Sequence, residues 1–114
     1  MKQPFASRFV VVCTNETLQD VVGDRVQPSI MRCFDRLVCR DANKDNVAMR
    51  LGFKQGDSII WYAGAQTLGA GEPCVGWGKV WLPGDWVPFA RFEGAAKGDK
   101  LELYTFGYTT ESPD

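Results

Sequence analysis

Histidine is absent from all 114 residues of the chain. Imidazole is the usual general base near neutral pH, and it completes Ser–His and Cys–His nucleophile pairs and histidine-ligated zinc sites. Those sites are therefore excluded. Glycosidase-like carboxylate pairs need two acids that converge, and the sequence marks no pair of its acidic residues as doing so. We expect a protein that is not an enzyme, with no catalytic residues and no cofactor.

The chain also lacks an excess of charge and any long apolar run. It has 13 basic and 14 acidic residues, for a net charge of −1. Nucleic-acid-binding proteins normally carry a basic excess or cluster, and the nearest approach here is the dispersed set Arg32, Arg36 and Arg40. The run from Phe9 to Cys13 is shorter than the roughly 7–15 residues of a signal-peptide core, and no run reaches the ~20 that span a bilayer. We expect neither nucleic acid nor membrane as a partner, and synthesis in the cytoplasm without a signal peptide.

Cysteine is present, but in no metal-binding or redox motif. The four residues Cys13, Cys33, Cys39 and Cys74 form no Cys-x-x-Cys. On one strand, Cys33 and Cys39 would share a face about 20 Å apart, at ~3.3 Å per residue, and could not be bridged. Scattered cysteines in apolar surroundings usually behave as small buried hydrophobes. We expect that role rather than a disulfide or a metal site.

The chain contains many residue pairs that are typical of tight turns. Gly-Asp occurs at Gly23-Asp24, Gly56-Asp57, Gly84-Asp85 and Gly98-Asp99, and the last three separate short apolar or aromatic runs. Glycine accepts positive φ without steric cost, and aspartate can hydrogen-bond the turn backbone. The spacing predicts strands joined by tight turns, with the last three turns forming the hinges of a β-meander.

Apolar and β-branched runs predict the strands themselves. The expected strands cover residues 8–14, 30–40, 47–53, 58–63, 75–82, 86–92 and 100–108. Residues 15–28 could add a short strand or a helical turn. The apolar positions of Ile30–Arg40 fit a helix about as well as a strand, and we favour a strand because the turn-rich segment Asp41–Asn46 follows. Val47–Phe53 alternates cleanly, as a half-buried strand does.

These strands predict the fold class. Seven or eight short strands at this spacing are typical of an all-β protein, here a single-domain antiparallel β-sandwich that is jelly-roll-like or Greek key. The domain covers residues 1–114, with a short N-terminal arm (1–7) and a polar C-terminal tail (110–114). Residues 65–73 form a glycine-rich loop. Pro88 predicts an edge strand or a bulge.

The segment Asp41–Asn46 has oxygen-bearing side chains at the first, third and fifth positions of a calcium loop. The sixth position is Asn46 rather than glycine, and the twelfth is Gly52 rather than glutamate, so the pattern fails. An Asx-rich turn accounts for it, and we expect no metal.

Aromatic residues crowd the second half of the chain and are the candidate contact residues. Trp77 and Trp81 have equal parity on one strand and should share a face, whereas Trp61 and Tyr62 must point in opposite directions. Exposed tryptophan suits either a protein interface or stacking on sugar rings, and the alternative is a thick aromatic core. The candidate contact residues are Trp61, Trp77, Trp81, Trp86 and Phe89, with Gly69 and Gly71 in the glycine-rich loop.

From Asp41 onward the chain resembles the small β-sandwich structural proteins of tailed-bacteriophage virions, such as capsid decoration (cement) and neck or tail accessory proteins. The matching features are the Asn-rich turn Asp41–Asn46, the strand Val47–Phe53, Leu82-Pro83-Gly84-Asp85, Gly94–Asp99 and the final strand Leu101–Gly107. The resemblance implies a virion component that binds major capsid or other virion proteins, as a homo-oligomer.

Three functions follow as hypotheses. The first is capsid decoration, with Trp77, Trp81, Trp86 and residues 64–78 in contact with assembled subunits. The second is a carbohydrate-binding module that uses Trp61, Trp77 or Trp86 as a stacking platform. The third is a small phage-encoded inhibitor of a host enzyme or defence system, which a pull-down from host lysate would distinguish from the other two.

Overall fold

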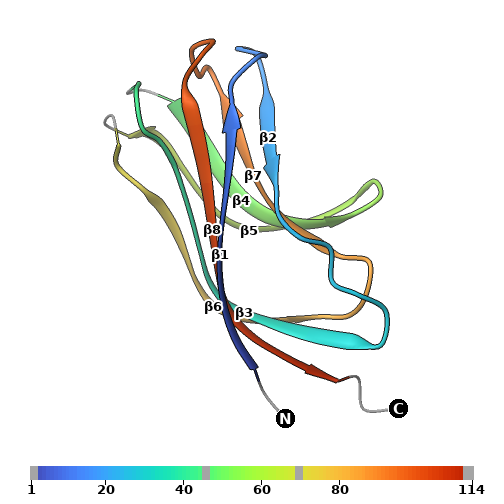
Figure 1. Ribbon diagram of the computed structural model, residues 1–114. Helices are drawn as coiled ribbons and strands as arrows, with labels where there is room; N and C mark the ends of the chain where they lie inside the picture. The colour runs from blue at the N-terminus through green and yellow to red at the C-terminus, as the bar shows by residue number, and fades with distance from the viewer. Residues whose placement is uncertain (1–2, 45–46, 69–70, 112–114) are drawn as a thin grey trace.

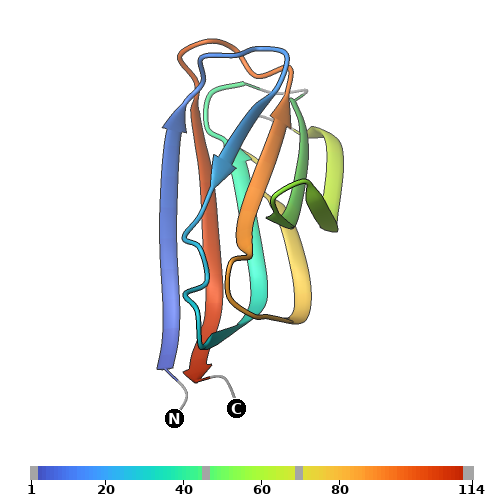
Figure 2. The same ribbon diagram turned by 90° about the vertical axis from the view of Figure 1, so that its right-hand side faces the viewer.

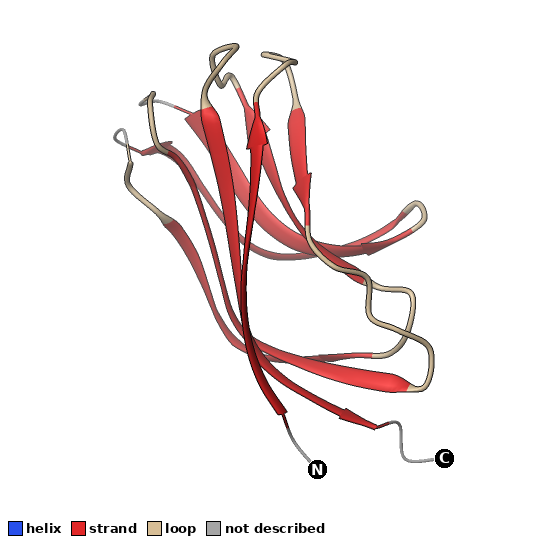
Figure 3. Cartoon of the chain, in the orientation of Figure 1, coloured by secondary structure: helices blue, strands red, loops and turns tan. Residues whose placement is uncertain are grey.

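The computed structural model describes residues 3–44, 47–68 and 71–111, and it consists of eight β-strands (Figures 1 and 3). In chain order the strands are β1 (Gln3–Val12), β2 (Gln19–Val22), β3 (Ile30–Asp41), β4 (Val47–Gln55), β5 (Ser58–Leu68), β6 (Cys74–Leu82), β7 (Val87–Glu93) and β8 (Lys100–Glu111). The predicted fold class, an all-β antiparallel sandwich, is confirmed. The described residues include no helix long and apolar enough to cross a membrane.

The strands form two four-stranded sheets packed face to face (Figure 2). We call the sheet with the order β1-β8-β3-β6 sheet A, and the sheet with the order β2-β7-β4-β5 sheet B. All pairs are antiparallel, and β1 pairs with β8, β2 with β7, β3 with β6 and β4 with β5. The first strand thus pairs with the last, the second with the second to last, and so on to the two central strands. This is the strand pairing of a long hairpin that is rolled into a jelly roll.

Alternation along each strand places the core between the sheets. Val47, Met49, Leu51 and Phe53 are all buried on the inner face of β4, as their spacing predicts. Phe34 from sheet A meets Phe53 from sheet B with ring centroids 5.2 Å apart. On each strand, the residues that alternate with the buried ones face outward. The two outer faces of the sandwich therefore carry mainly polar and aromatic side chains.

Several boundaries differ from those the sequence predicts. The ambiguous segment from Ile30 is strand β3, which confirms the strand interpretation. Residues 3–7, expected as an arm, pair with β8, and β8 itself runs to Glu111, into the expected tail. The expected loop at 65–73 is shorter, because β5 continues to Leu68. In each case cross-strand pairing extends a strand beyond its apolar run.

The predicted β-meander is wrong. Gly56-Asp57 does close a hairpin, because Gln55 pairs with Ser58 and Gly56 takes the positive φ of 57° that a two-residue turn requires. The turns at Gly84-Asp85 and Gly98-Asp99 instead carry the chain from one sheet to the other, since β6 and β8 belong to sheet A and β7 to sheet B. A turn signal marks a reversal but does not say which strand the chain pairs with next.

The prediction that Pro88 marks an edge strand is also wrong, because β7 lies between β2 and β4. Pairing between β2 and β7 stops at Val22 and Phe89, one residue short of the proline. There the Gly23 N–H donates to the Pro88 carbonyl over 2.9 Å, which uses the one backbone hydrogen-bonding group that proline retains. An interior strand tolerates the proline at this position.

A bulge in β3 overturns the predicted alignment of two cysteines. The register with β8 shifts between Phe34 and Arg36, so Asp35 is an extra residue. Cys39 consequently faces the core, whereas Cys33 lies opposite Trp81 and Tyr108 on the outer face. All four cysteines are buried with free thiols, as expected of small hydrophobes.

Candidate interaction surface

The outer face of sheet A carries an aromatic cluster near its β6 edge. Trp77 on β6 pairs with Arg36 on β3, which in turn pairs with Phe106 on β8. The Arg36 guanidinium lies 5.2 Å from the Trp77 ring centroid and 4.2 Å from that of Phe106. Cation–π contacts on both sides hold the arginine between the two rings. Trp77 nevertheless remains 70% exposed, the most open of the large apolar side chains described.

The cluster continues along β6 and β8. The rings of Trp81 and Tyr108 meet edge to face, with centroids 5.3 Å apart and an interplanar angle of 78°. Cys33 lies between them on β3 and is fully buried, while Trp81 remains 42% exposed. The predicted sharing of one face by Trp77 and Trp81 is confirmed. We call Trp77, Arg36, Phe106, Trp81 and Tyr108 the aromatic cluster of sheet A.

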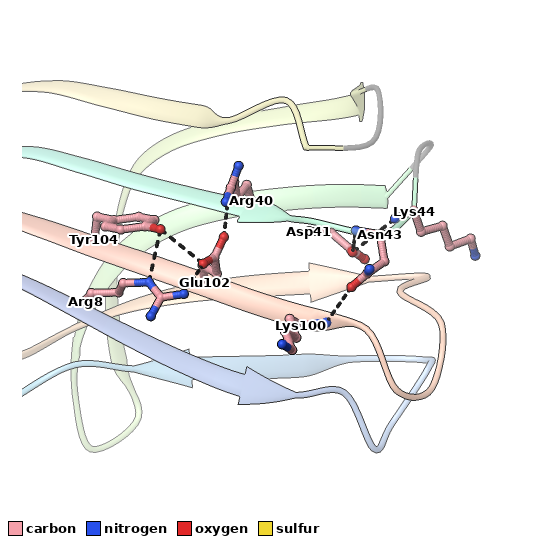
Figure 4. Close-up of polar contacts among 8 residues, drawn as sticks. All are labelled: Arg8, Arg40, Asp41, Asn43, Lys44, Lys100, Glu102 and Tyr104. Carbon is pink, nitrogen blue, oxygen red and sulfur yellow. Dashed lines mark hydrogen bonds and ion pairs between the residues drawn. The ribbon is translucent and has the colours of Figure 1, made fainter.

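Next to the cluster on the same face is a buried acid with three donors (Figure 4). Arg8 donates to Glu102 over 2.6 Å, Arg40 donates to the other carboxylate oxygen, and the Tyr104 hydroxyl donates over 3.1 Å. Burial by itself would raise the pKa of Glu102, but these hydrogen bonds outweigh it and the pKa is lowered. The network joins β1, β8 and β3 and keeps the centre of sheet A fixed.

The outer face of sheet B carries one tryptophan, Trp61, beside a group of ion pairs. Trp61 lies on Phe89, with ring centroids 5.4 Å apart, and Phe89 is fully buried beneath it. Lys54 and Arg91 flank Phe89, and both form ion pairs with Asp20, at 3.3 Å and 2.9 Å. Burial opposes ionisation of Asp20, but the hydrogen bonds from the two cations lower its pKa. Trp61 itself remains 40% exposed, while the two cations that flank Phe89 are already paired with Asp20.

Beside Trp61 lies an open hollow of about 320 Å³, lined by Arg50, Trp61, Tyr62, Ala63 and Gly64. The Arg50 guanidinium lies 4.6 Å from the Trp61 ring centroid. Tyr62 turns the other way, into the core against Phe53, which confirms that Trp61 and Tyr62 point in opposite directions. The hollow therefore offers one guanidinium and one indole to a ligand, with no second charged group lining it.

The structure separates the predicted contact residues. Trp77 and Trp81 lie together on sheet A, and Trp61 lies on the other sheet. Trp86 is only partly exposed and packs against the core, and Phe89 is buried, so neither presents an open face. Gly71 has a φ of 78°, and its N–H donates to the Asp41 carbonyl. Gly69 lies outside the described residues.

A carboxyl pair occupies one end of the sandwich. Asp41 is buried at the end of β3, and its Oδ1 accepts the backbone N–H groups of Asn43 and Lys44 at 2.9 and 3.2 Å, which confirms the Asx turn. Burial raises the pKa of Asp41 to about 6, and a hydrogen bond with the Asp99 carboxyl adds to the rise. Among the described residues no set of three or more histidine, cysteine or acidic side chains could hold a metal ion.

Sequence reasoning missed Arg36 and Glu102 as parts of this surface. Arg36 belongs to the dispersed basic set of the sequence, and nothing in the local sequence distinguishes Glu102. Parity along β8 would have placed Glu102 with Tyr104 on one face. The partners on β1 and β3 could not be paired with them, because sheet order does not follow from turn signals.

The sequence matches no family model and no curated protein sequence. The fold is similar to that of a chain in the acid-stable capsid of Helicobacter pylori bacteriophage KHP30, with a TM-score of 0.64, 13% identity and coverage of 97% of this chain and 99% of that one. It is also similar to the Drosophila NLP core, whose crystal structure concerns pentamer formation and histone binding, with a TM-score of 0.51, 10% identity and coverage of 96% and 99%.

A pentameric capsid protein from metagenomic phage sequences aligns with a TM-score of 0.44, 14% identity and coverage of 93% of this chain and 67% of that one. A family 29 carbohydrate-binding module aligns with a TM-score of 0.39, 9% identity and coverage of 97% and 80%. We draw no inference from these two alignments, because their TM-scores are below 0.5. Structural neighbours thus include phage capsid proteins, and at these identities the likeness shows the shared jelly-roll fold alone.

Proposed function

We propose that this chain is a structural component of a tailed-bacteriophage virion, a decoration protein that binds assembled capsid subunits without catalysing a reaction. The observation that carries the proposal is the aromatic cluster of sheet A, where Trp77 and Trp81 stand open at the β6 edge of a sheet whose interior is rigidly paired. Exposed tryptophan beside arginine is the composition typical of protein-interface hot spots.

The end-to-end likeness to a chain of the KHP30 capsid supports the same proposal. Because nearly all of each chain is covered, the two have nearly the same length. A fold of this kind and size therefore occurs in a phage capsid structure.

The two outer faces differ in how well they suit a partner. On sheet B, Trp61 packs on Phe89 and the flanking cations are already paired with Asp20. On sheet A, Trp77 and Trp81 lie on an edge strand, where Trp77 contacts the Arg36 guanidinium and Trp81 meets the Tyr108 ring. The proposed contact is therefore the β6 side of sheet A.

Binding of carbohydrate is the second candidate, favoured by the 70% exposure of Trp77. A sugar platform needs open ring faces lying roughly in one plane. Arg36 covers one face of Trp77, Arg50 lies over Trp61, and Trp81 stands nearly perpendicular to Tyr108. These contacts suit a platform less well than a protein interface. Tryptophan fluorescence titrated with a panel of glycans tests it, and quenching at millimolar sugar would favour this candidate.

Co-sedimentation with empty particles assembled from the matching major capsid protein tests the first candidate. We expect saturable binding at a fixed ratio to capsid subunits, and light scattering of the free protein should reveal a defined homo-oligomer. A monomer that stays in the supernatant at every particle concentration would refute the proposal.

A further inference from the structure

Two buried thiols face one another across the outermost pair of strands in sheet A. Cys39 on β3 and Cys74 on β6 are direct partners in the antiparallel register. Residues paired in this way project to the same side of the sheet, and both cysteines belong to the core cluster between the sheets. Cys39 is fully buried, and Cys74 is 4% exposed at the first residue of β6.

Antiparallel partners are separated by a distance that a disulfide can span. Directly opposed residues have Cα atoms about 4.5 or 5.5 Å apart, depending on the hydrogen-bonding position. Disulfides bridge Cα atoms about 4.4–6.8 Å apart. Both alternatives fall within that range, so no backbone movement is needed. Cys13 and Cys33 have no such partner, because the bulge turns Cys33 to the outer face and Cys13 follows β1.

The two thiols are already in contact and differ in reactivity. A hydrogen bond from Cys39 lowers the pKa of Cys74, and the same contact together with burial raises the pKa of Cys39. The thiolate is the attacking species in disulfide exchange. Cys74 also lies at a strand end, where local opening costs least. The pair therefore has one thiol of lowered pKa at a strand end and a second, fully buried thiol opposite it.

We propose that Cys39 and Cys74 are a disulfide-forming site, oxidised by a small-molecule disulfide such as glutathione disulfide. The Cys74 thiolate attacks one sulfur of the glutathione disulfide; a bond from Cys74 to that sulfur forms, the glutathione S–S bond breaks and one glutathione leaves. The Cys39 thiolate then attacks the Cys74 sulfur and displaces the second glutathione. Two protein thiols lose two electrons and two protons, and one glutathione disulfide becomes two glutathione thiols.

The bond would fasten the edge strand that bears the aromatic cluster. β6 is hydrogen-bonded to β3 alone in sheet A, and its pairing is interrupted between Trp77 and Val80. A covalent link at Cys74 fixes the end of β6 three residues from Trp77. The site does not depend on the proposed function, since it rests on the sheet register and on the burial of the two thiols.

Peptide mapping of the native chain tests this site directly. Trypsin places the four cysteines on separate peptides, with Cys39 in residues 37–40 and Cys74 in residues 55–79. After exposure to glutathione disulfide and alkylation, we expect the 37–40 and 55–79 peptides joined, two hydrogens lighter than their sum. Free thiols in denaturant should fall from four to two, and dithiothreitol should restore them.

The melting temperature provides a second readout. Closing a loop of this length should raise it on the order of 10 °C, and Cys33→Ala, the matched control on the same strand, should keep both the cross-link and the rise. Cys39→Ala should lose both. Four free thiols after oxidation, a link between other cysteines, or a lower melting temperature in the oxidised protein would each overturn the proposal; the wild-type map decides even if Cys39→Ala fails to fold.

Discussion

At the scale of single residues, the surroundings of two buried carboxyl groups have opposite effects on their ionisation. Glu102 receives two guanidinium groups and a tyrosine hydroxyl, so it is held ionised in spite of its burial. Asp41 receives two backbone N–H groups but faces Asp99, a second acid, so its charge is disfavoured. Neither environment is visible from local sequence, because each combines residues that are more than 50 positions apart.

Asp41 should make the protein more stable in mild acid. Its pKa rises from 3.8 in the unfolded chain to about 6 in the folded protein, so the folded state binds the proton more tightly. The resulting stabilisation is complete below about pH 3.8 and is lost as pH rises through about 6. Between pH 7.5 and pH 5 the free energy of unfolding should increase by about 1 kcal/mol, measured by urea denaturation.

Asp41→Asn is the matched variant for this pH effect. Its amide oxygen can still accept the Asn43 and Lys44 N–H groups, and its NH₂ can donate to Asp99. The pH dependence between 5 and 7.5 should disappear. The pKa values of Asp20 and Glu102 are lowered from their ordinary values of 3.8 and 4.5. These two groups therefore change the stability below those pH values, outside the range from pH 5 to 7.5. An unchanged slope in Asp41→Asn would contradict the assignment.

Glu102→Gln should destabilise the protein by about 1–3 kcal/mol, because the variant keeps the shape but removes the charged acceptor of three hydrogen bonds. Arg8→Ala is the control: the Arg8 side chain is 57% exposed, so solvent screens its ion pair and the loss of stability should be clearly smaller. Chemical denaturation of both variants at pH 7.5 and low salt measures the difference. Equal losses in the two variants would show that Glu102 is not the centre of the network.

At the scale of elements, the β3 bulge decides which residues reach the outer face of sheet A. It places Cys33 and Arg36 on the same side, and it brings the backbone of Cys33 and Phe34 against Gly107 of β8. A Cβ on Gly107 would collide with the Cys33 carbonyl, and backbone cannot move aside as a flexible side chain can. Glycine is therefore required on β8 where the chain bulges towards it.

Gly107→Ala should cost at least about 2 kcal/mol, since the added methyl group forces sheet A apart at the bulge. Gly64→Ala on β5 is the matched control, because its Cβ would meet Arg50 at an ordinary 3.4 Å. Thermal unfolding compares the two variants. A Gly107→Ala protein as stable as Gly64→Ala would show that the bulge is not as close to β8 as described here.

Strand existence was predictable from sequence, whereas sheet membership was not. Alternation in Val47–Phe53 and the Gly56-Asp57 turn act over a few residues, and both predictions are confirmed. The extension of β1 back to Gln3 depends on pairing with β8, a hundred residues away, which local propensity does not encode. Similarly, Trp77 and Trp81 were assigned to one face by parity, but the burial of Phe89 follows from Trp61 lying over it.

At the scale of the whole molecule, the rolled hairpin gives the chain two outer faces of different character. On sheet B, a single half-exposed tryptophan, Trp61, packs on Phe89 beside the ion pairs of Asp20; on sheet A, Trp81 and the far more exposed Trp77 lie together on an edge strand. The fold resembles that of a phage capsid chain over its full length. The central claim is that the β6 side of sheet A binds assembled capsid subunits.

Co-sedimentation of paired variants with empty capsid particles tests that claim most directly. Trp77→Ala with Trp81→Ala should lower affinity at least tenfold, because buried aromatic anchors contribute about 2 kcal/mol or more each to an interface. Ile60→Ala, an exposed apolar residue of sheet B, should bind as the unmodified protein does, and circular dichroism should show both variants folded. Full binding by the folded double variant, or an equal loss in Ile60→Ala, would contradict the account.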